Sequence, residues 1–478
     1  MQYSRISTII KAKEHIKMND MKHNMKSLFM YMTVALLGCA MMLSCSKDAL
    51  DSDSEPGLYP QENPVDDMVV YMLPKAQAID LTYEQKKFTQ NNNAFTLQFL
   101  KTVNDADQTG KGFIYSPLSV TYVLSMVNAA AEGQTSQEIE QTLGFMLGYT
   151  EAGLNDVNAY SKKLIEGLPL VDPNVQLSIA NAIFVSSRYT LKPQFQQEMQ
   201  QYYHAQAESL DFSSPATLGH INGWCNEQTG GMIPTILEQV NPDAMSYLLN
   251  AIYFKAGWAA KFDPKKTKNE EFTTENGNTV QLPMMHQTVK ALYLADSTYS
   301  AIEFSYGSGL WNMTLMLPNE GKTTDDIINV LAQKRRLRGH SDGFCSTMEE
   351  VLYYPYEVDL KVPRFETHSD TNTPDYTLID LLKQMGIRQV FDPDLAQVPN
   401  LCEGANAFIS MMRQKAAIEV NEDGAEAAAV TIAEMEATTS ADPMEYPKTT
   451  FHANRPFVYA IQEASSGVIL FVGKYTGK

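Results

Sequence analysis

The sequence has 478 residues, 44% hydrophobic and 19% charged, an ordinary globular composition that excludes global disorder and collagen-like repeats. Its 37 Lys and Arg against 56 Asp and Glu give a formal net charge of −19, which argues against nucleic acid and anionic lipid as electrostatic partners. Five Cys in a chain of this length do not make a disulfide framework.

The first 44 residues indicate an export signal. A basic stretch precedes the apolar run 28–43, which is short for a membrane span but suits the apolar core of a secretory signal. Cys39 and Cys45 end the run, and each resembles the lipidated Cys of bacterial lipoproteins. Cys45 is favoured because a Lys- and Asp-rich stretch follows it, as in surface-exported lipoproteins of Bacteroidetes. A simple signal peptide with two incidental Cys is the alternative.

Three segments are therefore expected: a signal peptide (1–44), an acidic flexible tether (45–80) and one domain (81–478). The tether is rich in Asp, Pro, Ser and Glu and has little periodicity. The predicted location is the outer membrane, with the domain exposed at the cell surface or outside the cell. The membrane is expected as a partner only through the lipid.

The domain is predicted to begin with helices. An apolar helical face is formed by Phe88, Phe95, Phe99 and Val103. Ser116 followed by Pro117 predicts a second helix start. Thr135-Ser136-Gln137-Glu138 has the pattern of a capping box and predicts a third.

Apolar runs predict strands, mainly in the C-terminal half. They are 175–185, 247–254, 313–317, 358–362, 457–461 and 468–472. Because the helices come first and do not alternate with the strands, the predicted fold class is α+β with large sheets.

The familiar catalytic signatures are absent from the sequence. There is no Gly-x-Ser-x-Gly or His-Glu-x-x-His, and the eight His are scattered singly. Gly321-Lys322-Thr323 resembles the end of a phosphate-binding loop, but Met316 stands where that loop needs Gly. We therefore expect no enzyme activity, and neither a cofactor nor a metal.

The most informative segment follows a predicted strand that ends at Val420. Residues 424–430 are mostly Ala and Gly, so one interpretation is a short helix followed by a surface loop. The other interpretation is a strand with period two. One face would then be uniformly small, with Ala425, Ala427, Ala429, Thr431 and Ala433; the other would carry Glu426, Ala428, Val430, Ile432 and Glu434. Such a segment suits a loop that is exposed in one state and buried as a strand in another.

The stretch Glu422-Asp423-Gly424-Ala425-Glu426-Ala427-Ala428-Ala429 resembles the proximal hinge of the serpins, the serine protease inhibitor family. Further matches follow in the family's order between about residue 85 and the end of the chain. They include Ser116-Pro117-Leu118-Ser119, Ile221-Asn222-Gly223-Trp224, Leu249-Asn250-Ala251-Ile252-Tyr253-Phe254, Ala256-Gly257-Trp258, Val362-Pro363-Arg364-Phe365 and Asn454-Arg455-Pro456-Phe457.

The resemblance implies a serpin fold with three β-sheets, about eight or nine helices and an exposed reactive-centre loop. It also implies a suicide-substrate mechanism, in which a protease cleaves the loop, forms an acyl-enzyme, and is trapped when the loop inserts as a strand into the main sheet. A monomer is expected. The alternative is a non-inhibitory serpin-like binding protein on the bacterial surface, which uses the scaffold without loop insertion.

The resemblance also assigns residues. Ser116, Ser119, Asn250, Trp258 and Gln414 are placed in the breach and shutter, the regions that control opening of the sheet. Gln414 stands where many members have His, so we expect function to be kept and pH sensitivity there to be reduced.

In the hinge, Ala425 replaces the usual Thr or Ser. Because Ala is small and uncharged, its entry into the sheet should remain easy.

The reactive bond is predicted between Thr438 and Thr439 by counting seventeen residues in the family's register from Glu422. Counting back from Pro456 gives a position near Glu445 instead, so the loop is about seven residues longer than usual for the family. The hinge count is preferred because about fifteen extended residues, roughly 50 Å, set how far the protease travels. The window around Thr438 has no Lys or Arg, which favours elastase-like or subtilisin-like proteases, or papain-like cysteine proteases, as targets. Segments 336–356 and 369–375 are longer than the family norm.

Overall fold

The computed structural model of the chain describes residues 76–147, 150–151, 154–333, 356–404, 407–425 and 446–478. Several predicted features lie outside the described residues: the export signal with Cys39 and Cys45, the tether as far as residue 75, Glu426, Ala427, Ala428, Ala429, and the reactive bond at Thr438 and Thr439. Segment 336–356 lies outside it as well, except for its last residue.

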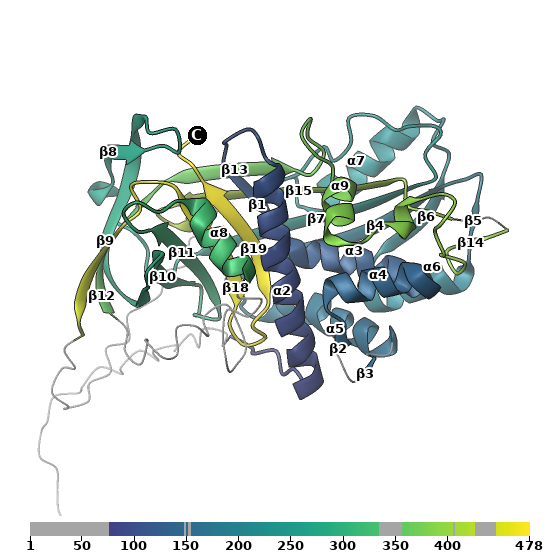
Figure 1. Cartoon of the computed structure of the whole chain (residues 1–478), viewed down its shortest axis with the longest axis horizontal. Helices are drawn as coiled ribbons and strands as arrows, with labels where there is room; N and C mark the ends of the chain where they lie inside the picture. The colour runs from purple at the N-terminus through teal and green to yellow at the C-terminus, as the bar shows by residue number, and fades with distance from the viewer. Residues whose placement is uncertain (1–75, 148–149, 152–153, 334–355, 405–406, 426–445) are drawn as a thin grey trace, which may run out of the picture. The chain divides into compact units, whose positions relative to one another are not determined.

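The described residues contain eight α-helices, five of them in the first part of the domain (Figure 1). They are α2 (Tyr83–Ala106), α3 (Pro117–Ala130), α4 (Gly133–Leu143), α5 (Leu154–Gly167), α6 (Pro193–Tyr203), α7 (Ala216–Gln228), α8 (Thr324–Gln333) and α9 (Leu378–Met385). Short 3-10 turns lie at Leu168–Leu170, Pro264–Lys266 and Gln389–Phe391. None of the helices in the described ranges is both long and apolar enough to cross a membrane.

The helix starts confirm one sequence signal and correct another. Ser116 is the N-cap of α3 and its hydroxyl accepts from the Ser119 amide, with Pro117 at the first helical position. The capping box predicted at Thr135 is wrong, because α4 begins at Gly133. The Thr135 hydroxyl instead accepts from the amide of Gln397, a tertiary contact that the local pattern does not reveal.

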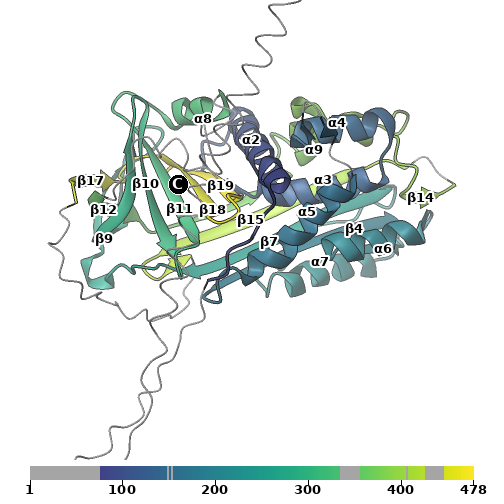
Figure 2. The same cartoon turned by 90° about the horizontal axis from the view of Figure 1, so that it is seen from below.

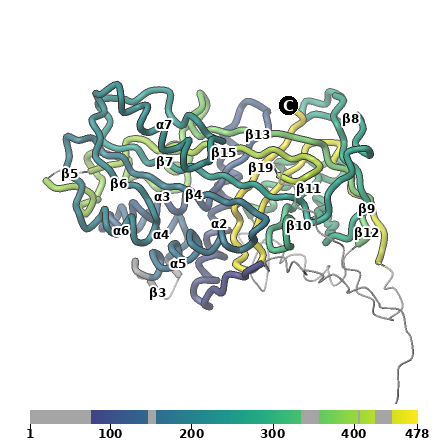
Figure 3. Tube along the Cα trace, turned by 180° about the vertical axis from the view of Figure 1, so that it is seen from behind, coloured from purple at the N-terminus to yellow at the C-terminus, as the bar shows by residue number. Residues whose placement is uncertain are grey.

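The main sheet has six strands in the order β13-β15-β16-β7-β4-β6. Figure 3 shows β13, β15, β7 and β4 running alongside one another. The strands are β4 (Val175–Ser186), β6 (Gln206–Leu210), β7 (Ser246–Gly257), β13 (Phe365–Asp370), β15 (Met411–Asn421) and β16 (Gly424–Ala425).

Nine other strands form two sheets that share the long strand β9 (Thr279–Ala295). One follows the order β1-β19-β18-β11-β10-β9, and the other joins β8, β9, β12 and β17. Their bounds are β1 (Phe113–Tyr115), β8 (Lys268–Thr273), β10 (Tyr299–Tyr306), β11 (Trp311–Pro318), β12 (Tyr356–Pro363), β17 (Lys448–His452), β18 (Phe457–Glu463) and β19 (Ile469–Tyr475). Two small ribbons pair β2 (Met146–Leu147) with β3 (Thr150–Glu151), and β5 (Thr190–Leu191) with β14 (Cys402–Glu403).

Helices cover both faces of the six-stranded sheet (Figure 2). On one face, α3 packs against β4 and β7 within the large core. On the other, α7 packs against β4, in a second core that also includes residues of β7 together with Trp224, Ile236 and Leu237. The predicted fold, α+β with three main sheets and eight or nine helices, is confirmed.

Candidate functional site: the seam of the main sheet

The predicted hinge, breach and shutter residues that the structure describes lie along the boundary between β15 and β7, which we call the seam. The two strands pair in parallel from Met411 opposite Tyr247 to Lys415 opposite Ala251, and we call this stretch the far end. At the other end, the hinge end, β16 lies between them. Ala425 pairs with Val420 of β15 and with Ala256 of β7, antiparallel to both. The first residues of the predicted hinge are therefore already a strand of the main sheet.

Between these two stretches the seam is split. Residues 416–419 of β15 and 252–255 of β7, all within the described structure, do not pair with each other. A small cavity of about 50 Å³ lies there, lined by residues 252–254 and 417–419 and by Met232 and Ile233 from the segment after α7. The opening continues the line of β16 toward the far end.

The turn into β16 is fixed by charge and by the neighbouring backbone. The Arg364 guanidinium donates to both carboxylate oxygens of Glu422, at 2.7 and 2.6 Å, and the Thr267 hydroxyl donates to the same group. Burial raises the pKa of the Glu422 carboxyl, but these hydrogen bonds outweigh it and hold the pKa below its ordinary value. Glu422 therefore stays charged and anchors the start of the hinge.

Trp258, a predicted breach residue, closes the other side of the turn. Its indole Nε1–H donates to the Asn421 carbonyl at 2.9 Å and its amide donates to the Asp423 carbonyl at 2.8 Å. Its ring stacks on Tyr306, with centroids 4.2 Å apart. Trp258 thus ties both residues that flank Glu422 to the end of β7.

Gly424 is required by the close approach of β16 to β7. Its φ of 143° is rarely adopted by residues with a side chain, and a Cβ there would lie 2.0 Å from the Ala256 carbonyl oxygen. Ala425 follows with only 1% of its surface exposed. A Gly and then a small side chain are what the first step into the sheet demands.

At the far end, the predicted shutter residues lie on the α3 face of the sheet. The Gln414 side chain accepts from the Ser116 amide at 2.9 Å and donates to the Ser116 carbonyl at 2.8 Å. The Ser116 and Ser119 hydroxyls are 3.1 Å apart and hydrogen-bonded. This cluster joins β15 to the start of α3 and is fully buried.

Asn250 extends this polar level across the sheet, because it lies opposite Gln414 on β15 and Asn181 on β4. Its Nδ2 donates to the Asn181 Oδ1 at 2.9 Å. Its Oδ1 is buried and accepts no hydrogen bond within the described residues. The Asn250 Oδ1 is therefore a buried hydrogen-bond acceptor in the seam, at the level of Gln414, with no donor among the described residues.

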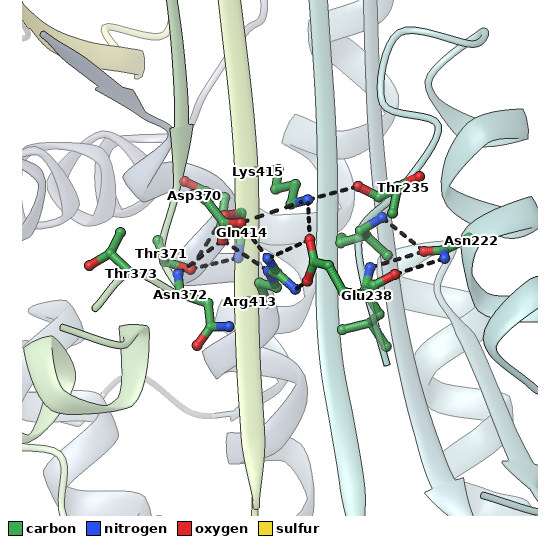
Figure 4. A network of polar contacts seen from close by, with 12 residues as sticks. Asn222, Thr235, Glu238, Asp370, Thr371, Asn372, Thr373, Arg413, Gln414 and Lys415 are labelled. Carbon is green, nitrogen blue, oxygen red and sulfur yellow. Dashed lines mark hydrogen bonds and ion pairs between the residues drawn. The ribbon is translucent and has the colours of Figure 1, made fainter. Parts of the chain in front are cut away.

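The opposite face of the far end carries a charged cluster that sequence reasoning missed (Figure 4). Arg413, whose side chain is 4% exposed, donates to Asp370 at the end of β13 and to Glu238 in the segment between α7 and β7. Lys415 also binds Glu238, at 3.1 Å. Burial disfavours the charged form of Arg413, but the hydrogen bonds that it donates to the two carboxylates outweigh burial and raise its pKa.

Glu238 responds to the same contacts. Its hydrogen bonds to Arg413 and Lys415 lower the pKa of the carboxyl to about 2.

A signal for the cluster was present in the sequence. Even-numbered residues of β15 are apolar or shutter residues, whereas Arg413 and Lys415 place two cations on the other face. Their acidic partners are far away in sequence and carry no such signal.

Comparisons with known proteins agree with the fold. The sequence profile of the family Serpin (serine protease inhibitor) matches residues 90–477. The chain is 30% identical to the antitrypsin of Bombyx mori over 80% of this chain and 92% of that protein. It is also 30% identical to the leukocyte elastase inhibitor of Bos taurus, over 80% of this chain and 97% of that protein.

Among solved structures, the native state of the thermophilic serpin tengpin superposes with a TM-score of 0.71 at 24% identity, covering 85% of this chain and 98% of that one. The family profile spans most of the chain, and the fold agrees with it. The chain therefore belongs to the serpin family.

Proposed function

We propose that this serpin is an inhibitor that traps a serine endopeptidase as an acyl-enzyme by inserting its cleaved reactive loop into the seam. The observation that carries the proposal is the split seam: β16 already occupies its hinge end, and beyond β16 the strands β15 and β7 do not pair with each other and line a small cavity. This geometry is what insertion of a further strand requires, and it is the reason for preferring an inhibitor to a non-inhibitory binding protein.

The strand registers support insertion along the whole seam. Continuing the antiparallel register from Ala425 opposite Ala256 brings Glu434 opposite Tyr247. Continuing it from Ala425 opposite Val420 brings the same Glu434 opposite Met411. Met411 and Tyr247 are already partners across the far end. An inserted strand would therefore match both neighbours without a slip, which matters because a slip of one residue exchanges the two faces.

The side chains of such a strand would suit the spaces they enter. Ala427, Ala429 and Ala433 would follow Ala425 onto the α3 face, where space beside the core is small. Thr431 would arrive between Gln414 and Asn250. Its hydroxyl would then be a donor for the Oδ1 of Asn250, which accepts no hydrogen bond within the described residues.

The chemistry belongs to the protease. Its nucleophilic Oγ attacks the carbonyl carbon of Thr438, the peptide bond to Thr439 breaks, and the Thr439 amine leaves with the proton that the protease's base removed from Oγ. An ester joins the protease to Thr438. About a dozen inserted residues, at roughly 0.5–1.5 kcal/mol per net hydrogen bond, supply on the order of 10 kcal/mol for insertion. The position of the scissile bond follows from the hinge count. In the inserted strand, Thr438 would lie just beyond Glu434, the residue opposite the last pair of the far end.

The expected target cleaves after small residues. The window Glu436-Ala437-Thr438-Thr439-Ser440 offers no cation for a trypsin-like pocket. One relative is named as an inhibitor of leukocyte elastase. We therefore propose elastase-like or subtilisin-like serine proteases, with papain-like cysteine proteases as a further class.

The test is complex formation with a panel of elastase-, subtilisin-, papain- and trypsin-like proteases. We expect an SDS-stable complex with an elastase-like member and a released C-terminal fragment that begins at Thr439. Cleaved chain without a complex across the panel would contradict inhibition. A cleaved form whose urea midpoint does not rise would favour the non-inhibitory binding protein instead.

We also propose that the protein is exported and anchored at the bacterial outer membrane through a lipid on Cys45. The support is the apolar run before Cys45 and the acidic stretch after it. Labelling with a fatty-acid analogue in a bacterial host should fail for Cys45→Ser and persist for Cys39→Ser. The reverse result would move the anchor to Cys39.

A further inference from the structure

Arg413 lies between two carboxylates that belong to opposite sides of the seam. Asp370 accepts from its Nε at 2.9 Å and also from its Nη2. Glu238 accepts from its Nη1 at 2.5 Å and its Nη2 at 3.2 Å. A guanidinium with two separate carboxylate partners can lose one and remain paired.

Glu238 is attached to the β7 side of the seam. Asn222 of α7 accepts from the amides of Ile236 and Leu237 and donates to the Leu237 carbonyl at 2.8 Å (Figure 4). Both apolar residues are buried in the core formed by α7, β4 and β7. The residues just before Glu238 are therefore fixed to that side by packing and by hydrogen bonds.

Asp370 is attached to the β15 side of the seam. It ends β13 and pairs in register with Lys415 of β15. The Thr371 amide also donates to the Gln414 carbonyl at 3.0 Å, so the chain just past β13 stays attached to β15. The Arg413–Asp370 pair therefore lies within one side, whereas the Arg413–Glu238 pair crosses the seam.

Opening the seam by one strand adds about 4.8 Å between β15 and β7, which is enough to break the contact with Glu238. We propose that Glu238 and Arg413 form a latch across the seam, and that Asp370 keeps Arg413 paired when the latch releases. Resting on the proposed insertion mechanism, the latch sets the insertion rate and so the share of encounters that end in a trapped protease.

Lys415 reinforces the latch. Its Nζ donates to the Thr235 carbonyl at 3.0 Å, binds Glu238 at 3.1 Å, and lies 3.7 Å from Asp370. Removing the Glu238 charge therefore weakens the contacts that both Arg413 and Lys415 make across the seam. Removing the Asp370 charge leaves those contacts intact and takes away the partner that Arg413 needs after release.

Two isosteric substitutions should therefore act in opposite directions. Glu238→Gln removes the ion pair that opening must break, so insertion should speed up by on the order of fivefold. Asp370→Asn makes Glu238 the sole carboxylate of Arg413, so opening would leave a guanidinium without a counterion, and insertion should slow by a similar factor.

The experiment measures two quantities on full-length protein. The first is the number of inhibitor molecules consumed per protease trapped, which falls when insertion outpaces deacylation. The second, which needs no protease, is the native-state hydrogen exchange of the far-end amides of β15 and β7. The matched control is Glu166→Gln, an ion-paired carboxylate on α5 away from the seam.

Faster exchange and fewer molecules consumed in Glu238→Gln, with slower exchange and more consumed in Asp370→Asn, would support the latch. Shifts of the same sign in both variants, or none beyond the control, would overturn it. If the wild-type protein traps no protease, the proposed function fails, and the exchange rates still decide whether the latch exists.

Discussion

The two ends of the seam are held in different ways. At the hinge end, a Gly and a buried Ala enter between β15 and β7 through backbone pairing, under a turn fixed by Glu422, Arg364 and Trp258. At the far end, side-chain clusters hold the seam from both faces, Gln414 with Ser116 on one and Arg413 with Glu238 on the other. Under the proposed mechanism, the hinge end would start insertion and the far end would resist it.

This difference indicates an order of events. A strand entering from the hinge end meets an opening first and the two polar clusters only afterwards. Under the proposed mechanism, the hinge end would decide whether insertion begins, and the far end would decide how fast it finishes and how stable the uninserted state is. Substitutions at the hinge end should therefore change whether a complex forms, whereas substitutions at the far end should change the stability of the uninserted protein.

The largest effect is expected from Ala425→Arg. A cation would have to be buried between Val420 and Ala256 without a partner, which costs several kcal/mol. Gel analysis with the target protease should show complete cleavage and no complex. Ala464→Arg, at an exposed position in a turn, is the control and should leave inhibition intact. Complex formation by Ala425→Arg would contradict insertion.

Gln414→Ala should weaken the far end without touching the hinge. It leaves the buried amide of Ser116 unpaired, at about 1–3 kcal/mol, whereas the Ser116 carbonyl still accepts from the amides of Ser119 and Val120. Urea unfolding should show a less stable native form, and the uncleaved loop should insert more readily on mild heating. Gln176→Ala, exposed on β4 of the same sheet, should change neither. An unchanged urea midpoint would mean that Gln414 does not hold the far end.

Thr431→Val should affect only the inserted state. The native protein should keep its urea midpoint, whereas the cleaved protein should lose about 1 kcal/mol because Asn250 Oδ1 stays without a donor. Urea unfolding of the cut and uncut forms separates the two effects. Equal losses in both forms would place Thr431 outside the inserted strand.

The smallest effect concerns pH. The Glu238 pKa of about 2 lies below its ordinary 4.5, so the ion pair stabilises the native state above pH 4.5 and is lost as pH falls toward 2. The urea midpoints of wild type and Glu238→Gln should therefore differ, by about 0.5 kcal/mol in stability, at pH 6 and converge as the pH falls from 4.5 toward 2. A difference that is undiminished below pH 2 would assign it to packing rather than charge.

Much of the fold and part of the site could be predicted from the sequence. The hydrophobic runs at 175–185 and 247–254 became β4 and β7, since long apolar runs suit strands buried on both faces. The helix start at Ser116 was predicted correctly, whereas the start predicted at Thr135 was wrong: α4 begins at Gly133, and the Thr135 hydroxyl accepts from Gln397 in another part of the chain. The charged cluster was missed because Glu238 and Asp370 meet Arg413 only after the sheet and α7 have packed.

The sequence alone determined the chemistry of the hinge: Gly424, a row of small residues with period two, and no cation near Thr438. These properties are local, since backbone freedom, side-chain size and charge belong to each residue by itself. Only the tertiary structure decided where that strand can go. The agreement of the β15, β16 and β7 registers, the split beyond Ala425 and the two partners of Arg413 all depend on segments far apart in the chain. Such distances and registers are set by packing, which no local pattern encodes.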